Sequence, residues 1–215
     1  MSAHRIQRIA VCGWLIALLA GCGGGESGAG TSAAEELARF CETKPFTPPA
    51  QSPYRLPYAV GSTFTMFQGN CPPNPAWGHH GKFAYDFDLP LSTPVYAMRA
   101  GTVVFVANGY SNDDHIAGHE NGVWMMHADG TISNYLHLSP NSVTVLLNAS
   151  VQPGDYIGLS GNSGASSGPH LHVEAYANGL NFNKSNTVPI TFSNAGGATE
   201  PSGGLIQGNA YTALP

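Results

Sequence analysis

The apolar residues of this chain fall into short segments from Tyr58 onward, and turn residues separate these segments at intervals of about eight to twelve positions. Each segment is rich in β-branched and aromatic side chains, which is typical of strands in a sandwich or barrel. The sequence shows no long helical periodicity, and Asp129-Gly130 is a strong hairpin signal. We therefore predict an all-β fold, with an antiparallel sheet arranged as a sandwich or partly open barrel. The predicted strands cover residues 83–89, 94–98, 101–107, 122–127, 132–138, 156–160 and 170–176.

The first residues carry the pattern of an export signal. Arg5 and Arg8 form a short basic region, and an apolar run follows over residues 9–20. This run is too short to anchor the chain as a spanning helix and has the length of a signal-peptide core. It leads into Leu-Ala-Gly-Cys at 19–22, which resembles the bacterial lipobox, a motif whose cysteine is lipidated. We predict that Cys22 becomes a lipidated amino terminus, and an ordinary signal peptide that contains a cysteine is the alternative.

This processing sets the predicted domain layout and location. Residues 1–21 form the signal peptide, 22–40 the lipidated cysteine and a flexible linker, 41–192 the folded domain and 193–215 a polar C-terminal tail. Acyl chains on Cys22 would hold the protein at a membrane without crossing it. A glycine, not the aspartate that favours inner-membrane retention in enteric-type bacteria, follows the cysteine. We expect a lipid-anchored protein of the cell envelope, on the periplasmic face of the outer membrane.

The charge balance argues against a nucleic-acid partner. Charged residues make up 10% of the chain, against about 25% in an average domain. Removal of the signal peptide leaves six basic side chains against thirteen acidic ones, so the formal net charge of the mature chain is −7. Proteins that bind nucleic acids carry the opposite balance. The 27 glycines and 16 prolines instead indicate many turns and polar, uncharged loops.

Two cysteines remain for the folded domain. Cys12 leaves with the signal peptide and Cys22 is reserved for lipid, so Cys41 and Cys71 are left. In an oxidising compartment this pair is expected to form a disulfide that stabilises the domain by about 3 kcal/mol. Two free buried thiols are the alternative.

Eight of the nine histidines lie between positions 79 and 172, without a matching richness in lysine or arginine. His170 and His172 are two residues apart, so on an extended strand both rings point to the same face of a sheet. Neutral imidazole nitrogens beside carboxylates are the ligands that zinc prefers. The cluster therefore indicates a metal site on one face of the predicted sheet.

Side chains alternate between the two faces of a sheet, and this alternation predicts the orientation of further residues on two more predicted strands. In the segment 83–88 the three aromatic residues point one way, and Asp86 and Asp88 share the opposite face. Near the end of the segment 132–138 we expect Leu136 and Leu138 to face the core. Tyr135 and His137 then lie on the opposite side.

The ordered motifs of the chain resemble the lysostaphin-like, or LytM-type, zinc metallopeptidase family, whose members cut peptide bonds in bacterial cell-wall peptidoglycan. The resemblance covers roughly residues 58–192. It implies a lysostaphin-like fold with an active-site cleft along the sheet, a Zn²⁺ cofactor, peptidoglycan peptides as substrates and a monomer. Its connecting signatures are Thr-Pro-Val-Tyr-Ala at 93–97, Gly-Thr-Val-Val at 101–104, Asp-Gly at 129–130, Val-Gln-Pro-Gly-Asp at 151–155, Ser-Gly-Asn-Ser-Gly at 160–164 and Ser-Gly-Pro-His-Leu-His at 167–172.

The resemblance implies that His79, Asp86 and His172 are the zinc ligands. Asp86 is preferred to Asp88 because the family aspartate lies four residues before a proline. His79 is preferred because a glycine follows at the family spacing, and the adjacent His80 is the alternative. The interval between His79 and Asp86 is longer than the three-residue gap of the family's commonest form.

His137 and His170 match the two histidines of the family's active site that do not bind metal. The resemblance implies that they orient or deprotonate the attacking water, stabilise the oxyanion and return a proton to the leaving amine. The remaining histidines of this region receive no catalytic role. His127 is expected to be structural, and His115 and His119 to be loop residues that at most line the cleft.

The resemblance leaves functions of three kinds to compare. The first is a zinc endopeptidase that acts on peptidoglycan, and the complete set of ligands and catalytic histidines favours it. The second is a non-catalytic regulator, because some membrane-anchored relatives lose the ligands and activate cell-wall amidases. The third is a zinc peptidase that prefers glycine-rich proteins to the cell wall.

Overall fold

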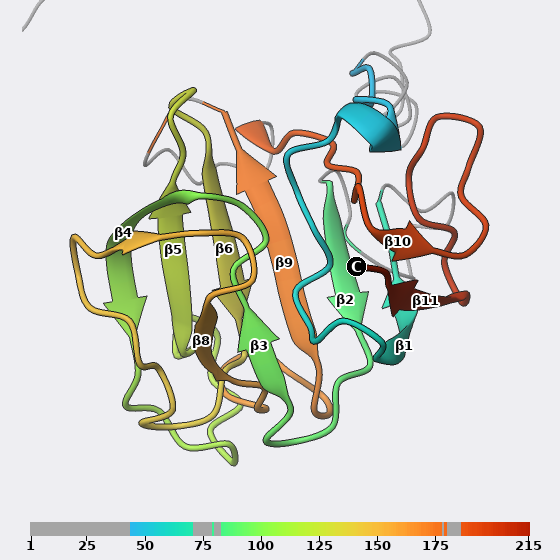
Figure 1. The fold of residues 1–215 in the computed structure, drawn as a ribbon. Coiled ribbons are helices and arrows are strands. Elements are labelled where there is room, and N and C mark those ends of the chain that lie inside the picture. Colours follow the sequence, from blue (N-terminus) through green and yellow to red (C-terminus); the bar gives the residue numbers. More distant parts are fainter. Residues whose placement is uncertain (1–43, 71–78, 80–82, 178, 180–185) are drawn as a thin grey trace, which may run out of the picture. The chain divides into compact units, whose positions relative to one another are not determined.

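Antiparallel strands make up most of the regular structure in a computed structural model of the chain (Figure 1). The structure describes residues 44–70, 79, 83–177, 179 and 186–215, all within the unit Thr31–Pro215. The predicted signal peptide, the lipid site Cys22, the disulfide pair Cys41 and Cys71, and the alternative ligand His80 lie outside the described residues.

Most strands coincide with the predicted segments to within two residues at each end. One short 3-10 turn, η1 (Pro49–Gln51), precedes them. The strands are β1 (Thr63–Gln68), β2 (Ala84–Phe87), β3 (Pro94–Tyr96), β4 (Gly101–Ala107), β5 (Gly122–Met126), β6 (Ile132–Leu136), β7 (Ser150–Val151), β8 (Tyr156–Leu159), β9 (Leu171–Tyr176), β10 (Ala195–Gly196) and β11 (Ala210–Ala213). Strands β1, β7, β10 and β11 are additions to the prediction.

The strands form one large sheet and one small one. Nine strands hydrogen-bond in the order β10-β11-β1-β2-β9-β6-β5-β4-β7, and β3 pairs with β8. Every pair of named strands is antiparallel. The prediction of an all-β, antiparallel fold with an open sheet is confirmed. Among the described residues, no helix combines the length and the apolar character that a membrane-spanning segment requires.

The core lies on one face of the large sheet. Tyr85 and Phe87 of β2 are fully buried there, which confirms the face predicted for these aromatic side chains. Val95 of β3 and Ile157 of β8 belong to the same apolar cluster, so the small sheet contributes to this core. The opposite face of β2 carries Asp86, because neighbouring strand residues point to opposite faces.

The end of β6 departs from the predicted alternation. Tyr135 is fully buried in the core, where its hydroxyl accepts a hydrogen bond of 2.6 Å from the Met98 backbone N–H. Leu136, expected in the core, lines the cleft instead. The following residue, His137, has a positive φ of 63° and lies beyond the strand, so it interrupts the alternation. His137 and Leu136 consequently lie on the same side.

The segment 193–215, predicted to be a polar tail, is instead part of the large sheet. β11 pairs with β1, and β10 covers the outer edge of β11. Tyr211 of β11 is fully buried, accepts a hydrogen bond of 2.7 Å from the Ile206 N–H and donates one of 2.8 Å to the Ala198 carbonyl. The few apolar residues of this Gly- and Ala-rich segment therefore complete the core, and the folded domain extends beyond residue 192.

Candidate metal centre and active-site cleft

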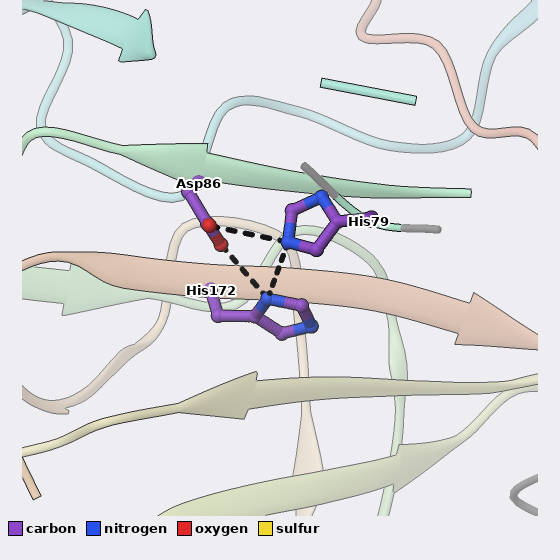
Figure 2. Close-up of side chains that lie close together, drawn as sticks. All are labelled: His79, Asp86 and His172. Atoms are coloured by element: carbon purple, nitrogen blue, oxygen red, sulfur yellow. Dashed lines mark hydrogen bonds and ion pairs between the residues drawn. The ribbon is translucent and has the colours of Figure 1, made fainter. Parts of the chain in front are cut away.

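Two neighbouring strands bring Asp86 and His172 together. β2 and β9 pair so that Asp86 lies directly opposite His172, and both side chains point away from the core. His79 approaches from the chain before β2, where it forms an isolated bridge with Asn70. Figure 2 shows the three side chains pointing toward one another.

The three groups contact one another closely. His79 Nε2 lies 3.1 Å from Asp86 Oδ2 and 3.1 Å from His172 Nδ1, and Asp86 Oδ1 lies 2.8 Å from His172 Nδ1. The other ring nitrogen of His79, Nδ1, is 3.3 Å from the Gly69 carbonyl and donates to it, which leaves the Nε2 lone pair facing the cluster.

This donor set fits a zinc ion. One ligand atom from each side chain lies within 4.8 Å of the other two, and all three side chains are buried. Two imidazole nitrogens and one carboxylate are a common ligand set of catalytic zinc, which keeps a further coordination position open. Among the described residues, His79 is the histidine that the structure brings to Asp86 and His172.

The charges in the cluster shift the pKa values of Asp86 and His172. Burial alone would raise the pKa of Asp86, but His172 and His79 outweigh it and hold the pKa well below its usual range. Burial alone would lower the pKa of His172, but Glu174 and Asp86 outweigh it and raise the pKa to about 9. Asp86 is therefore ionised at neutral pH, as a ligand must be, and a metal ion would compete with a proton for His172.

His137 and His170 lie beside the cluster. Their ring centroids are 4.4 Å apart, and His170 Nε2 lies 3.9 Å from Asp86 Oδ1. His137 Nδ1 donates a hydrogen bond of 2.7 Å to the Ser163 carbonyl, and His170 Nδ1 donates one of 2.8 Å to the Gly168 carbonyl. Both rings are thus fixed by a backbone acceptor through Nδ1.

The environment of His137 favours its neutral form. Burial, followed by the charges of His170 and His172, lowers the pKa of His137 to about 4. Because Nδ1 carries the proton that the Ser163 carbonyl accepts, Nε2 of the neutral ring keeps a free lone pair. His137 can therefore accept a proton at neutral pH.

The five predicted site residues line one cleft with a volume of about 330 Å³. The cleft also contains residues that the sequence did not place there. Phe67 packs edge-on against His170 with ring centroids 5.6 Å apart, and Leu136 and Glu120 form other parts of the wall. A second cavity of about 350 Å³ lies around Tyr54 and Arg99 and contains none of the clustered histidines.

Glu120 connects two loops at the rim of the cleft. Its carboxylate accepts hydrogen bonds from the backbone N–H of Gly118, at 3.0 Å, and of Ala165, at 3.1 Å. The sequence predicted that His115 and His119 of the same loop at most line the cleft, and it predicted no role for Glu120. His119 instead pairs with Asp114 at 2.8 Å, and neither His119 nor His115 lines the described cleft.

His127 is held by structural hydrogen bonds, as its place at a strand end suggested. Its Nδ1 lies 2.8 Å from the Ala100 carbonyl and its Nε2 lies 2.9 Å from Ser133 Oγ. Burial lowers the pKa of His127, so the ring is neutral. Asp88, to which Asp86 is preferred as a ligand, is exposed to solvent.

Several curated bacterial proteins similar to this chain are named as endopeptidases or metalloproteases. Peptidoglycan DD-endopeptidase ShyA of Vibrio cholerae is 39% identical over 110 residues, which cover 50% of this chain and 23% of that protein. DD-carboxypeptidase/endopeptidase Mpg of Neisseria meningitidis is 37% identical over 98 residues, which cover 46% of this chain and 20% of that protein. The chain thus spans about a fifth of the length of these curated relatives.

Among solved structures, the catalytic domain of the antimicrobial peptidase lysostaphin from Staphylococcus simulans is similar at 27% sequence identity. The match covers 60% of this chain and 87% of that chain, with a TM-score of 0.44. The sequence itself matches peptidase family M23 over residues 80–184. Together with the two relatives, this match agrees with the family that the motifs indicated: residues 80–184 of this chain match peptidase family M23, a family of zinc metallopeptidases.

Proposed function

We propose that the protein is a zinc-dependent endopeptidase that hydrolyses peptide bonds of bacterial cell-wall peptidoglycan. The observation that carries this proposal is that three metal-binding groups and two further histidines line a single cleft. The substrate class is supported by ShyA, which is named as a peptidoglycan DD-endopeptidase, and Mpg is named as a DD-carboxypeptidase/endopeptidase. The complete set of ligands favours an enzyme over a regulator that lacks metal.

In this proposal His79 Nε2, the Asp86 carboxylate and His172 Nδ1 hold the metal. Zinc, when bound, supplies a Lewis acid that activates a water molecule and polarises the scissile carbonyl. Asp86 and His172 come from the paired strands β2 and β9, so these two groups are held together before substrate arrives.

His137 acts as the general base. Its neutral ring presents Nε2 to the cleft while Nδ1 remains bound to the Ser163 carbonyl. The lone pair on Nε2 accepts the proton of the attacking water. The left-handed backbone at His137, with φ of 63°, is what turns the ring into the cleft at the end of β6.

His170 stabilises the negative charge that develops on the substrate. In its protonated form it donates through Nδ1 to the Gly168 carbonyl and presents its Nε2–H to the cleft. A donor aimed at the developing oxyanion lowers the barrier, because the charge is stronger in the transition state than in the substrate. The same proton can then pass to the leaving amine.

We further propose a location and covalent features for the mature protein. Removal of residues 1–21 and lipidation of Cys22 would place a monomeric peptidase at the cell envelope, on the periplasmic face of the outer membrane. Cys41 and Cys71 would form a disulfide in that oxidising compartment. The lipobox-like sequence and the Gly- and Ser-rich segment that follows it support this arrangement.

Digestion of purified peptidoglycan tests the proposed activity. The zinc-loaded full chain should release fragments that carry new amino groups, detected by mass spectrometry, and should do so on at least one of several cross-bridge types. Chelated protein and a folded Asp86→Asn variant serve as controls. Zinc-loaded, folded protein that cuts no peptide bond in any of these substrates would overturn the proposal, and stimulation of an added amidase would then favour a regulator.

A further inference from the structure

A buried acid lies behind the proposed ligand His172. Glu174 follows His172 by two residues on β9, so both side chains point to the same face of the sheet. Glu174 is only 2% exposed, and it does not line the described part of the cleft. Its role is therefore not direct contact with substrate.

Three polar groups surround one oxygen of Glu174. Oε1 accepts hydrogen bonds from Asn134 Nδ2, at 3.0 Å, and from the Tyr176 hydroxyl, at 2.5 Å. The third group is His172 Nε2, which lies 3.4 Å from the same oxygen. Asn134 also accepts a hydrogen bond of 3.2 Å from the Glu174 backbone N–H, so strand β6 fixes the carboxylate in place.

The two nitrogens of His172 thus face different partners. Nδ1 faces Asp86 and His79, and Nε2 faces Glu174. A neutral imidazole carries its proton on one nitrogen, so Nδ1 can bind a cation only when Nε2 holds the proton. A carboxylate next to Nε2 favours that form and makes the ring a stronger ligand.

The distance of 3.4 Å is long for a hydrogen bond, and Nε2 has no hydrogen-bond partner among the described residues. We propose that Glu174 is a positioning residue, which holds His172 with its proton on Nε2 and its Nδ1 lone pair directed at the metal. The proposal rests on the metal site of the proposed function.

The test measures zinc affinity in the full chain by competition with a chromophoric chelator. Glu174→Gln keeps the size of the side chain but removes its charge, and we expect zinc affinity to fall about 10- to 100-fold. Tyr176→Phe is the matched control, because it removes a donor to the same carboxylate oxygen and leaves His172 untouched. Its zinc affinity should stay within about threefold of the wild-type value. This change is smaller than the 10- to 100-fold loss of affinity expected when a direct hydrogen-bond partner of a metal ligand is changed.

Replacement of zinc by cobalt supplies a second measurement, which would not change if Glu174 only stabilised the fold. The visible absorption of bound Co²⁺ reports the geometry of the ligands, and we expect it to shift in Glu174→Gln and not in Tyr176→Phe. If the glutamine variant does not fold, Glu174→Asp replaces it, since it keeps the charge but withdraws it from His172, and weaker zinc binding is again expected.

Unchanged zinc affinity together with an unchanged cobalt spectrum in a folded Glu174 variant would overturn the positioning role. That outcome differs from a failure of the metal site itself. In the latter case the wild-type protein would bind no zinc that depends on His172, whatever residue stands at position 174.

Discussion

Asp86 Oδ1 lies 2.8 Å from His172 Nδ1, and the two residues are direct cross-strand partners on β2 and β9. The register of these strands therefore sets the distance between two of the proposed ligands. A slip of one residue would move one side chain to the core face, because side chains alternate along a strand. The buried aromatic side chains of Tyr85 and Phe87 oppose such a slip.

The first prediction concerns this pair. Asp86→Asn preserves the shape of the side chain but removes the charge, so zinc affinity should fall by more than the roughly 100-fold loss that follows from changing an outer partner. Asp88→Asn is the matched control, since Asp88 is exposed on the same chain segment. Chelator competition on both variants measures the effect, and equal affinities would contradict the ligand role.

The second prediction separates catalysis from metal binding. His137→Gln should lower kcat on a peptide substrate by about 10²- to 10⁴-fold, the range for loss of a general base. Zinc affinity should change little, because His137 does not belong to the group of possible ligands. A parallel loss of zinc would assign His137 to the metal site and not to proton transfer.

The third prediction is a pH dependence of the metal-free protein. The native pKa of His137 is lowered to about 4, and that of the unfolded chain is about 6.5. Between these values the unfolded chain binds a proton that the native ring does not, so the free energy of unfolding rises with pH. The contribution of His137 to the free energy of unfolding is complete above about pH 6.5 and is lost as the pH falls through about 4.

Denaturant titrations at several pH values check this. Relative to His137→Gln, the wild-type protein should gain on the order of 3 kcal/mol in unfolding free energy between pH 4 and pH 6.5. Comparing the two proteins cancels the titration of more distant groups. A difference that does not vary with pH would show that His137 is not held neutral.

The fourth prediction uses two glycines of the loop before β9. Gly164 has a φ of 75°, and a Cβ there would lie 2.5 Å from the Glu120 side chain. Gly164→Ala should therefore displace Glu120 and weaken peptide cleavage while zinc binding persists. Gly168→Ala should keep full activity, because a Cβ at Gly168 meets no atom within 4 Å. Equal activities of the two variants would show that peptide cleavage does not depend on the position of Glu120.

The fifth prediction concerns the C-terminal segment. Tyr211→Ala should lower the free energy of unfolding by about 3–5 kcal/mol, the range for large aromatic side chains removed from a core. Leu214→Ala, at a residue that is 46% exposed, should cost less than about 1 kcal/mol. If both variants lower the free energy of unfolding by the same small amount, the segment would be the dispensable tail that its composition suggested.

The sequence predicted the features that depend on local pattern. Alternation placed the aromatic residues of β2 in the core and Asp86 on the other face, and the spacing of His170 and His172 matched their shared side. These predictions succeed because strand geometry is set by neighbouring residues. The order of the motifs then indicated the family.

The predictions that were wrong concern features that depend on non-local contacts or on a single backbone angle. The left-handed conformation of His137 reversed the faces expected for Tyr135 and Leu136. The pairing of β11 with β1 joins segments about 150 residues apart, and no local pattern in a Gly-rich segment reports it. Likewise, the place of Glu120 in the cleft wall depends on the contact between two loops, which the sequence does not report.

Anomalous diffraction at the zinc absorption edge, from crystals of the zinc-loaded protein, tests the central claim most directly. The proposed site predicts a single strong peak about 2.0–2.2 Å from His79 Nε2, an Asp86 carboxylate oxygen and His172 Nδ1. His137 and His170 should lie near the peak without coordinating it. A peak bound by His80 in place of His79, or no peak between β2 and β9, would contradict it.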